Sequence, residues 1–200
     1  SDISLTVTPD LKGEGSTMLF VPLARDRRRL GGSALAQVYT QIGDTCPDLD
    51  EPALLGRAFA AVQSLLSSRS VLSGHDVSDG GPLVALLEMA FAGNLGLEVE
   101  LPAATAADGG GSAAGLLAAA FAEEPGLMFE VRADQVAAVT AQLAAADVPC
   151  VTLGRTTAAR HVRVTVAGEA APVIDAPLAT LRDVWEATSF ELEKLQTNPA

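Results

Sequence analysis

The chain has 200 residues, of which 48% are hydrophobic and only 4% are aromatic, and its net charge is −12. This length is sufficient for one hydrophobic core, in a single domain with a short appendage, built mainly from aliphatic side chains. The negative charge argues against nucleic acid as a partner, because phosphate backbones are bound by clustered Lys and Arg. A basic run at residues 25–29 is too short to offset it.

The sequence also limits where the protein acts. The longest apolar stretches, residues 113–122 and 136–146, are shorter than the roughly 20 residues of a membrane-spanning helix, so we expect no membrane association. Cys46 and Cys150 are far apart and lack metal-ligand spacing, which favours a reduced, cytoplasmic protein. The chain starts without Met and ends after a helical pattern with no closing turn, which predicts a fragment of a longer polypeptide.

The first third of the chain predicts two strands that flank two helices. An apolar run at residues 16–24 predicts a buried strand, and a first helix follows Ser33. Asp50 is a candidate cap for a second helix, whose first turn contains Pro52. That helix has a clear apolar stripe, formed by Leu54, Leu55, Ala58, Phe59, Val62, Leu65 and Leu66. A short strand is expected within residues 70–77.

The rest of the chain alternates between the two kinds of element. A helix is predicted over residues 82–92, where Gly93 and Asn94 can end it, and a strand with alternating polarity follows over 95–101. Further helices are expected at 113–124, 133–146 and from 177 onwards, and further strands at 125–132, 148–155, 161–168 and 171–175. This alternation predicts an α/β fold, and the closely spaced final strands predict a mixed sheet that is antiparallel in part.

Residues 73–93, SGHDVSDGGPLVALLEMAFAG, place a cluster of polar side chains directly before an apolar helix. One interpretation is an ordinary helix start. The carboxylate of Asp79 would accept hydrogen bonds from the first amides, and Pro82 is tolerated in the first turn because no partner is needed there. Gly80 and Gly81 would then only relax the tight turn.

The alternative interpretation is a site for a nucleotide and Mg²⁺. Ligands of α/β proteins bind where a strand ends before a helix, and glycines let a phosphate approach the helix amides. Carboxylates repel a bare phosphate, but Mg²⁺ takes oxygen ligands from both. In this interpretation Asp76 binds the metal, Ser78 donates to a phosphate, and Gly80 and Gly81 give the phosphate access. His75 is a candidate acid or base, although a lone histidine is more often a structural hydrogen-bonding group.

A second pair of glycines repeats this pattern at LGGSALAQ, residues 30–37. Gly31, Gly32 and Ser33 precede a predicted helix and could contact a phosphate or a carboxylate. The simpler interpretation, a plain turn with Ser33 as the helix cap, is slightly favoured. The partners of Arg27–Arg29, just upstream, are not indicated by the sequence.

Five segments, in this order, resemble the phosphoribosylformylglycinamidine synthase family, most closely its animal-type single-chain form. They are RLGGSALAQVY, PDLD, SGHDVSDGGPLVALLEMAFAGNLGLEVEL, FAEEPGLMFEV and VWEATSFELEKLQTNP. The resemblance covers nearly the whole chain. Pro82 stands where the family pattern has Leu, but it follows the glycines and removes no ligand.

The resemblance implies an ATP-dependent carbon–nitrogen ligase, which converts formylglycinamide ribonucleotide to the amidine with ammonia from glutamine. This chain resembles the C-terminal subdomain of the second of two AIR-synthetase-like units. It is therefore expected to form a three-layer α/β/α domain over residues 1–175, followed by a helical linker over 176–200. Its partners would be the first synthetase-like unit and a glutamine amidotransferase domain. The same resemblance assigns Mg²⁺ to Asp76 and ATP or ADP to Ser78.

Two other functions stay open. Another enzyme of the AIR-synthetase superfamily is disfavoured by the DVSDGG, EMAFAG and WEATSFELEKLQ segments. A purely structural scaffold, which spaces the synthase core from the amidotransferase domain, would need no ligand. The sequence separates neither a catalytic nucleotide from an auxiliary one nor one oligomeric state from another.

Overall fold

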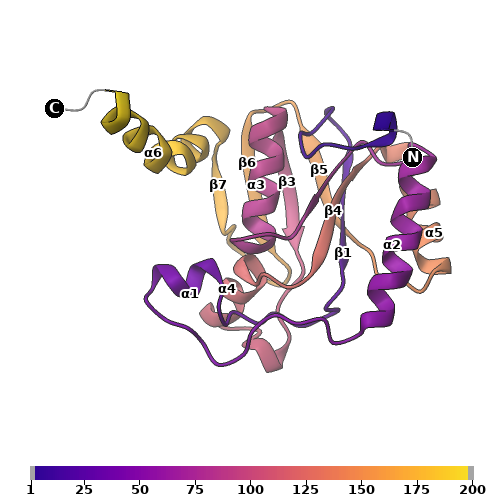
Figure 1. The fold of residues 1–200 in the computed structure, drawn as a ribbon, viewed down its shortest axis with the longest axis horizontal. Helices are drawn as coiled ribbons and strands as arrows, with labels where there is room; N and C mark the ends of the chain where they lie inside the picture. The colour runs from indigo at the N-terminus through magenta and orange to yellow at the C-terminus, as the bar shows by residue number, and fades with distance from the viewer. Residues whose placement is uncertain (1–2, 198–200) are drawn as a thin grey trace.

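The structure is a computed structural model that describes residues 3–197. Residues 1–2 and 198–200, at the outer ends of the two expected domains, lie outside the described residues. In the described part of the chain, one sheet of seven strands runs through the molecule, with α-helices against both faces (Figure 1). The strands are β1 (Thr17–Pro22), β2 (Ser73–Asp76), β3 (Gly96–Leu101), β4 (Gly126–Val131), β5 (Val151–Thr157), β6 (His161–Val166) and β7 (Ile174–Pro177). The helices are α1 (Ala34–Val38), α2 (Pro52–Ser67), α3 (Gly81–Gly93), α4 (Ala113–Phe121), α5 (Val136–Ala145) and α6 (Leu178–Thr197), and short 3₁₀ turns lie at Ile3–Leu5, Ala106–Asp108 and Ala133–Gln135.

The sheet is mixed, as the alternation along the sequence predicts. Its strand order is β2-β4-β1-β5-β3-β6-β7, and β3 and β6 are parallel while the other neighbours are antiparallel. The register between β1 and β5 shifts after the pair formed by Met18 and Gly154. A Cβ atom at Gly154 would collide with the carbonyl oxygen of Glu98, so glycine permits the close approach of β5 to β3 at this bulge.

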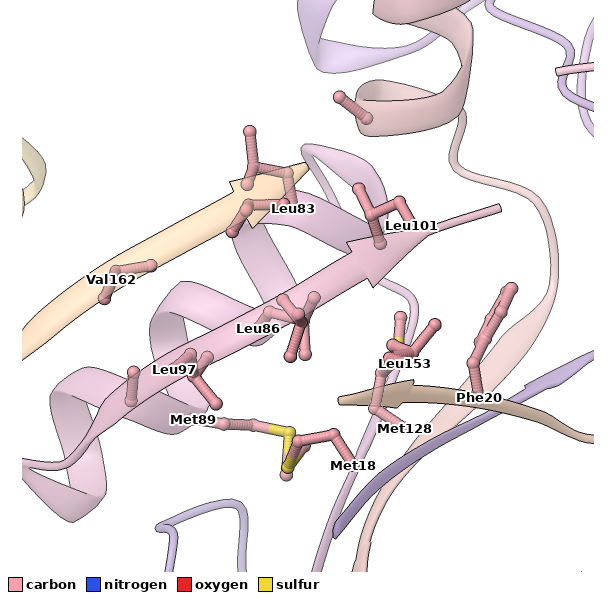
Figure 2. Packing of buried hydrophobic residues seen from close by; sticks show 14 of the residues in the cluster. Met18, Phe20, Leu83, Leu86, Met89, Leu97, Leu101, Met128, Leu153 and Val162 are labelled. Atoms are coloured by element: carbon pink, nitrogen blue, oxygen red, sulfur yellow. The ribbon is translucent and has the colours of Figure 1, made fainter. Parts of the chain in front are cut away.

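Two separate cores lie on opposite faces of the sheet. In β1, Met18 and Phe20 point into a core beneath α3 and α4, whereas Leu19 and Val21 point into a core beneath α2 and α5. Figure 2 shows the first of these, where side chains from α3 meet those of β1, β3, β4 and β6. Two helical layers with a sheet between them form the three-layer α/β/α arrangement that the resemblance implies.

The coverage of the sheet explains the patterns of its strands. Strands β1 and β4 are covered on both faces, and both are almost continuously buried. Strand β3 alternates, because Leu97, Val99 and Leu101 face the core while Glu98 and Glu100 are exposed. The half of the sheet beyond β5 therefore has one face in the core and one face open to solvent.

Helix α6 begins directly after the last strand. Leu178 is buried, and the ring of Trp185 lies 5.6 Å from that of Phe91 in α3. The rest of the helix leads away from the sheet (Figure 1), and Leu192 and Leu195 are exposed. The helix is thus attached to the domain by its first two turns.

The start and part of the buried face of α2 differ from the sequence prediction. Asp50 does not cap the helix, because its carboxylate accepts hydrogen bonds from the guanidinium of Arg29 instead. Leu55 and Phe59, predicted in the apolar stripe, are exposed. The helix presents Ala58, Ala61 and the remaining stripe residues to the sheet, so its buried face is narrower than the apolar pattern indicates.

Candidate functional site

The two glycine-rich turns leave the sheet at the same edge. Strands β1 and β2 are both antiparallel to β4, so their carboxyl ends point the same way. Residues 23–33 continue from β1, residues 77–80 continue from β2, and residues 121–125 lead into β4 from this side. Ligand sites of α/β proteins are usual at such an edge.

Asp76 is the last residue of β2, which is the outermost strand of the sheet. Its carboxylate is 73% exposed, and it lines an open groove of about 330 Å³ together with Val62, Leu66 and Leu127 among others. The side chain is neither turned into the core nor engaged in capping a helix. Its oxygens are accessible, as a metal ligand at this position requires.

His75, in contrast, is held against the protein. Its side chain is 17% exposed, and Nδ1 lies 2.7 Å from the backbone oxygen of Asp76. A carbonyl oxygen can only accept, so Nδ1 carries the proton of this hydrogen bond. Nε2 lies 3.5 Å from the carboxylate of Glu88 in α3. These contacts orient the ring as a structural group would be oriented, and a catalytic role for His75 stays a prediction.

The predicted cap at Asp79 is wrong. The residue before α3 is Gly80, and its left-handed backbone, with φ of 87°, turns the chain so that the helix begins at Gly81. The side chain of Asp79 is exposed and makes no cap bond to the helix. Ser78 is half-buried, and its carbonyl oxygen accepts a hydrogen bond of 3.0 Å from the amide of Gly81.

Both glycines of this turn are needed for its shape. Gly80 and Gly81 have φ values of 87° and 72°, which disfavour residues with a side chain. A Cβ atom at Gly81 would lie 2.6 Å from the carbonyl carbon of Phe121, at the end of α4. The turn is therefore pressed against another backbone segment, and a direct contact between these glycines and a nucleotide stays a prediction.

Glu123, which the sequence analysis does not single out, joins the two glycine-rich turns. Its Oε1 atom accepts a hydrogen bond of 2.8 Å from the amide of Gly80 and another of 2.8 Å from the amide of Ala34. A carboxylate of the protein thus occupies the place at the starts of α3 and α1 where an external anion would be attracted. The sequence could have indicated Glu123, because it lies in the FAEEPG segment, which is part of one of the segments that resemble the family.

The turn at Gly31–Ser33 is a plain helix start, as slightly favoured from the sequence. The hydroxyl oxygen of Ser33 accepts from the amide of Ala36 at 3.2 Å and caps α1. The amides of Gly31 and Gly32 donate to the carbonyl oxygens of Thr45 and Ile42. With these donors engaged inside the protein, nothing in the turn favours a phosphate contact at Gly31, Gly32 or Ser33.

The arginines before this turn are structural. Arg29 and Glu124 form an ion pair of 2.7 Å in which each side chain is 6% exposed, and the hydrogen bonds that Arg29 donates to Glu124 raise the pKa of the guanidinium. Arg28 is buried over the ring of Phe20, and its burial lowers the pKa of its guanidinium. Arg27 lies 3.8 Å from the carboxylate of Asp108. The basic run therefore fastens the loop after β1 to the segments that precede α2 and β4 and to the 3₁₀ turn at Ala106–Asp108.

Over residues 3–197, no three His, Cys, Asp or Glu side chains are grouped so that they could hold a metal ion by themselves. The same part of the chain contains no helix that is long and apolar enough to cross a membrane. A divalent ion at Asp76 would thus have one carboxylate from this chain, and phosphates, water or other parts of the protein would supply its remaining oxygens.

Comparisons with known proteins agree with the resemblance seen in the sequence. The family described as "AIR synthase related protein, C-terminal domain" matches residues 13–167. The chain is 46% identical to the human phosphoribosylformylglycinamidine synthase over 99% of its own length and 14% of that protein. It is 46% identical to a probable chloroplastic/mitochondrial synthase of the same name from Arabidopsis thaliana, over 98% of this chain and 13% of that one. The chain thus spans about one seventh of the curated relatives that it matches.

Solved structures support the fold. The chain is similar to Thermotoga maritima PurL complexed with ATP, with a TM-score of 0.66 and 15% identity over 90% of this chain and 28% of that one. The complex of the same protein with FGAR gives a TM-score of 0.68 and 14% identity, over 90% of this chain and 30% of that one. The family match over residues 13–167 covers most of the sheet and both glycine-rich turns. This chain therefore belongs to the family of AIR synthase related protein, C-terminal domains.

Proposed function

We propose that this chain is one domain of a larger phosphoribosylformylglycinamidine synthase, to which it contributes part of a site for ATP or ADP and Mg²⁺. The identity of 44–46% with curated synthases over nearly the whole chain carries this proposal. The whole enzyme would be an ATP-dependent carbon–nitrogen ligase that forms the amidine of formylglycinamide ribonucleotide in purine biosynthesis. It would work with an amidotransferase domain that supplies ammonia from glutamine.

The exposed carboxylate of Asp76 supports the assignment of the metal. Asp76 lines the open groove with a largely exposed side chain, and carboxylate oxygens are the ligands that Mg²⁺ prefers. When bound, the ion would neutralise phosphate charge next to an acidic loop. Ser78, two residues further on, would donate its hydroxyl hydrogen to a phosphate oxygen. The Thermotoga PurL structures with ATP and ADP show nucleotides bound to proteins of this fold, which supports the class of ligand.

The domain boundary and the location are part of the same proposal. The sheet ends with β7 at Pro177, close to the expected boundary at residue 175, and the exposed later turns of α6 suit a linker towards a further domain. We keep a cytoplasmic location as a prediction, since the name of the Arabidopsis relative carries the words chloroplastic/mitochondrial.

The test uses the full-length enzyme and a matched pair of aspartates. Asp76→Asn should weaken the binding of the Mg²⁺-nucleotide by at least about tenfold. Loss of a residue that only orients a metal ligand already lowers metal affinity by about tenfold or more, and loss of the ligand itself should have at least that effect. Ser78→Ala should weaken nucleotide binding by about fivefold, the size of one lost hydrogen bond. The control is Asp79→Asn, which removes an exposed carboxylate three residues along the same loop.

Titration calorimetry, with the nucleotide content of the purified protein, measures these effects. Equal binding by the Asp76→Asn and Asp79→Asn variants would contradict the proposal. If Ser78→Ala also binds normally, the domain serves as a scaffold in the longer protein.

A further inference from the structure

The Asp76–Gly81 loop is held by one short segment that precedes β4. The amide of Val77 donates to the carbonyl oxygen of Gly126 at 2.9 Å, and Gly81 lies against the backbone of Phe121. Between these two contacts, the amide of Gly80 donates to Glu123. Ser78 and Asp79 thus form the middle of a loop whose two ends are fastened to residues 121–126.

The carboxylate of Glu123 does more than complete one helix start. An aspartate of the loop itself, Asp79, was available for an ordinary cap, but it points to solvent. The acceptor comes instead from a residue 43 positions further along the chain, and the same oxygen atom accepts from Ala34 in the other turn. A local cap would satisfy one helix, whereas this shared acceptor fixes the positions of two loops relative to each other.

The hydrogen bonds that Glu123 accepts have a second effect on the site. A carboxylate between the starts of α1 and α3 repels a free anion and uses the amides that would attract one. The accessible oxygens of Asp76 then remain as the place where a phosphate can approach, through a bound cation. By occupying these two amides, Glu123 would hold the loop in place and leave Asp76 as the point where a nucleotide approaches.

We propose that Glu123 is a positioning residue, which holds the Asp76–Ser78 loop in the orientation that binds the Mg²⁺-nucleotide. This inference rests on the proposed function, because it assumes that the loop binds a nucleotide. Glu123 itself touches no ligand in the proposal and acts through the backbone of Gly80.

The experiment compares three variants of the full-length enzyme. In Glu123→Ala, the amides of Gly80 and Ala34 lose their acceptor, so their hydrogen exchange should become about tenfold faster and the Mg²⁺-ATP dissociation constant should rise about tenfold. In Glu123→Gln, the side-chain oxygen can still accept from both amides, so both quantities should stay within about threefold of the parent. Rescue by this conservative change separates positioning from a need for the charge.

The control is Asp108→Ala. Asp108 also accepts a hydrogen bond from a backbone amide at this edge of the sheet, that of Arg28, but its hydrogen bonds and ion pair go to Arg28, Thr105 and Arg27 and not to the Asp76–Gly81 loop. The Asp108→Ala substitution should lower the thermal midpoint without changing the dissociation constant of Mg²⁺-ATP. Calorimetry well below the midpoint keeps general destabilisation out of the comparison.

The outcomes distinguish this inference from the proposed function. If Glu123→Ala and Asp108→Ala change nucleotide binding equally, or exchange at Gly80 and Ala34 is unaltered in Glu123→Ala, Glu123 is not a positioning residue. If Asp76→Asn binds nucleotide normally, the proposed function fails. Faster exchange at both amides in Glu123→Ala would still establish that Glu123 holds the two loops.

Discussion

Strands β1 and β4 are buried on both faces, whereas β3 and β6 are buried on one face and open on the other. One ion pair from each half shows the same difference. Arg29 and Glu124, beside β1 and β4, are almost completely buried, while Arg163 and Asp175, on β6 and β7, are each about 40% exposed or more. The half that carries the candidate site thus contains an ion pair that excludes water, and the other half presents a polar surface.

This difference predicts that equivalent changes have unequal effects in the two halves. A buried charge whose partner is removed stays in the protein interior without solvation, whereas an exposed charge is solvated by water and screened by salt. A backbone position enclosed by other chain segments tolerates no added atom, whereas an open turn tolerates one. Two predictions compare one residue of the site half with a matched residue of the other half, and a third tests the open half by itself.

The largest effect is expected for the buried ion pair. Glu124→Gln leaves the guanidinium of Arg29 buried with only the partly exposed Asp50 as a charged partner, which should cost about 4 kcal/mol of the free energy of unfolding. The matched change is Glu98→Gln, which breaks an exposed pair with Arg155 and should cost less than about 1 kcal/mol. Urea unfolding followed by circular dichroism measures both.

Salt sharpens this comparison. The loss caused by Glu98→Gln should shrink in 1 M salt, where the screening length falls to about 3 Å, and the loss caused by Glu124→Gln should persist. Equal losses for the two variants at low salt would show that burial does not distinguish the halves.

The second prediction concerns two glycines that both have a positive φ. Gly81 and Gly168 both have positive φ, but a Cβ at Gly81 would meet the backbone of Phe121, and a Cβ at Gly168 would meet nothing within 4 Å. Gly168→Ala should cost about 1 kcal/mol for the left-handed conformation alone. Gly81→Ala should cost about 3 kcal/mol, because overpacking adds to that strain.

The difference between these two variants isolates the collision from the backbone preference. It is read from the urea midpoints, provided that the slopes of the transitions agree. A Gly81→Ala variant as stable as Gly168→Ala would mean that α4 moves away from the turn at little cost.

The smallest effect is expected from the open half and depends on pH. The pKa of Asp175 is lowered from its ordinary 3.8, first by the hydrogen bond from His161 and then by the charge of Arg163. A carboxylate with a lowered pKa in the folded state stabilises it above the unfolded pKa, and this contribution is lost as the pH falls through the folded pKa. Stability should therefore decline less steeply below about pH 4 in Asp175→Asn than in the parent.

Denaturation midpoints measured from about pH 6 to pH 2 test this prediction. Parallel curves for the parent and Asp175→Asn would show that the exposed cluster contributes nothing to stability. The expected difference is small because solvent and salt screen these charges.

Most of the fold follows from local patterns in the sequence. The alternating polarity of β3 and the continuous apolar run of β1 predict both strands, and they also reflect how many faces of each strand are covered. Asn94, in a left-handed conformation, ends α3 where the Gly93–Asn94 pair predicts an end. These features depend on neighbours in the sequence, which is why the sequence reveals them.

The candidate site is less predictable, because its contacts join distant segments. The spacing of Asp76, Ser78 and the glycines identifies the loop, but Glu123 is 43 residues from Gly80 and 89 from Ala34. Likewise, Asp50 resembles a helix cap by position, and its actual partner is Arg29, 21 residues away. No local pattern indicates which carboxylate a distant amide or guanidinium will select.

The bulge at Gly154 has a consequence for the shape of the whole sheet. A bulge bends its strand and increases the local twist. This one lies on β5, between the half of the sheet that helices cover on both faces and the half that they cover on one face. We expect the open surface of β3 and β6 to be tilted away from the plane on which α2 and α5 lie. Gly154 would then mark a bend in the sheet, and a straight helix packed on one side of this bend could not also pack on the other side.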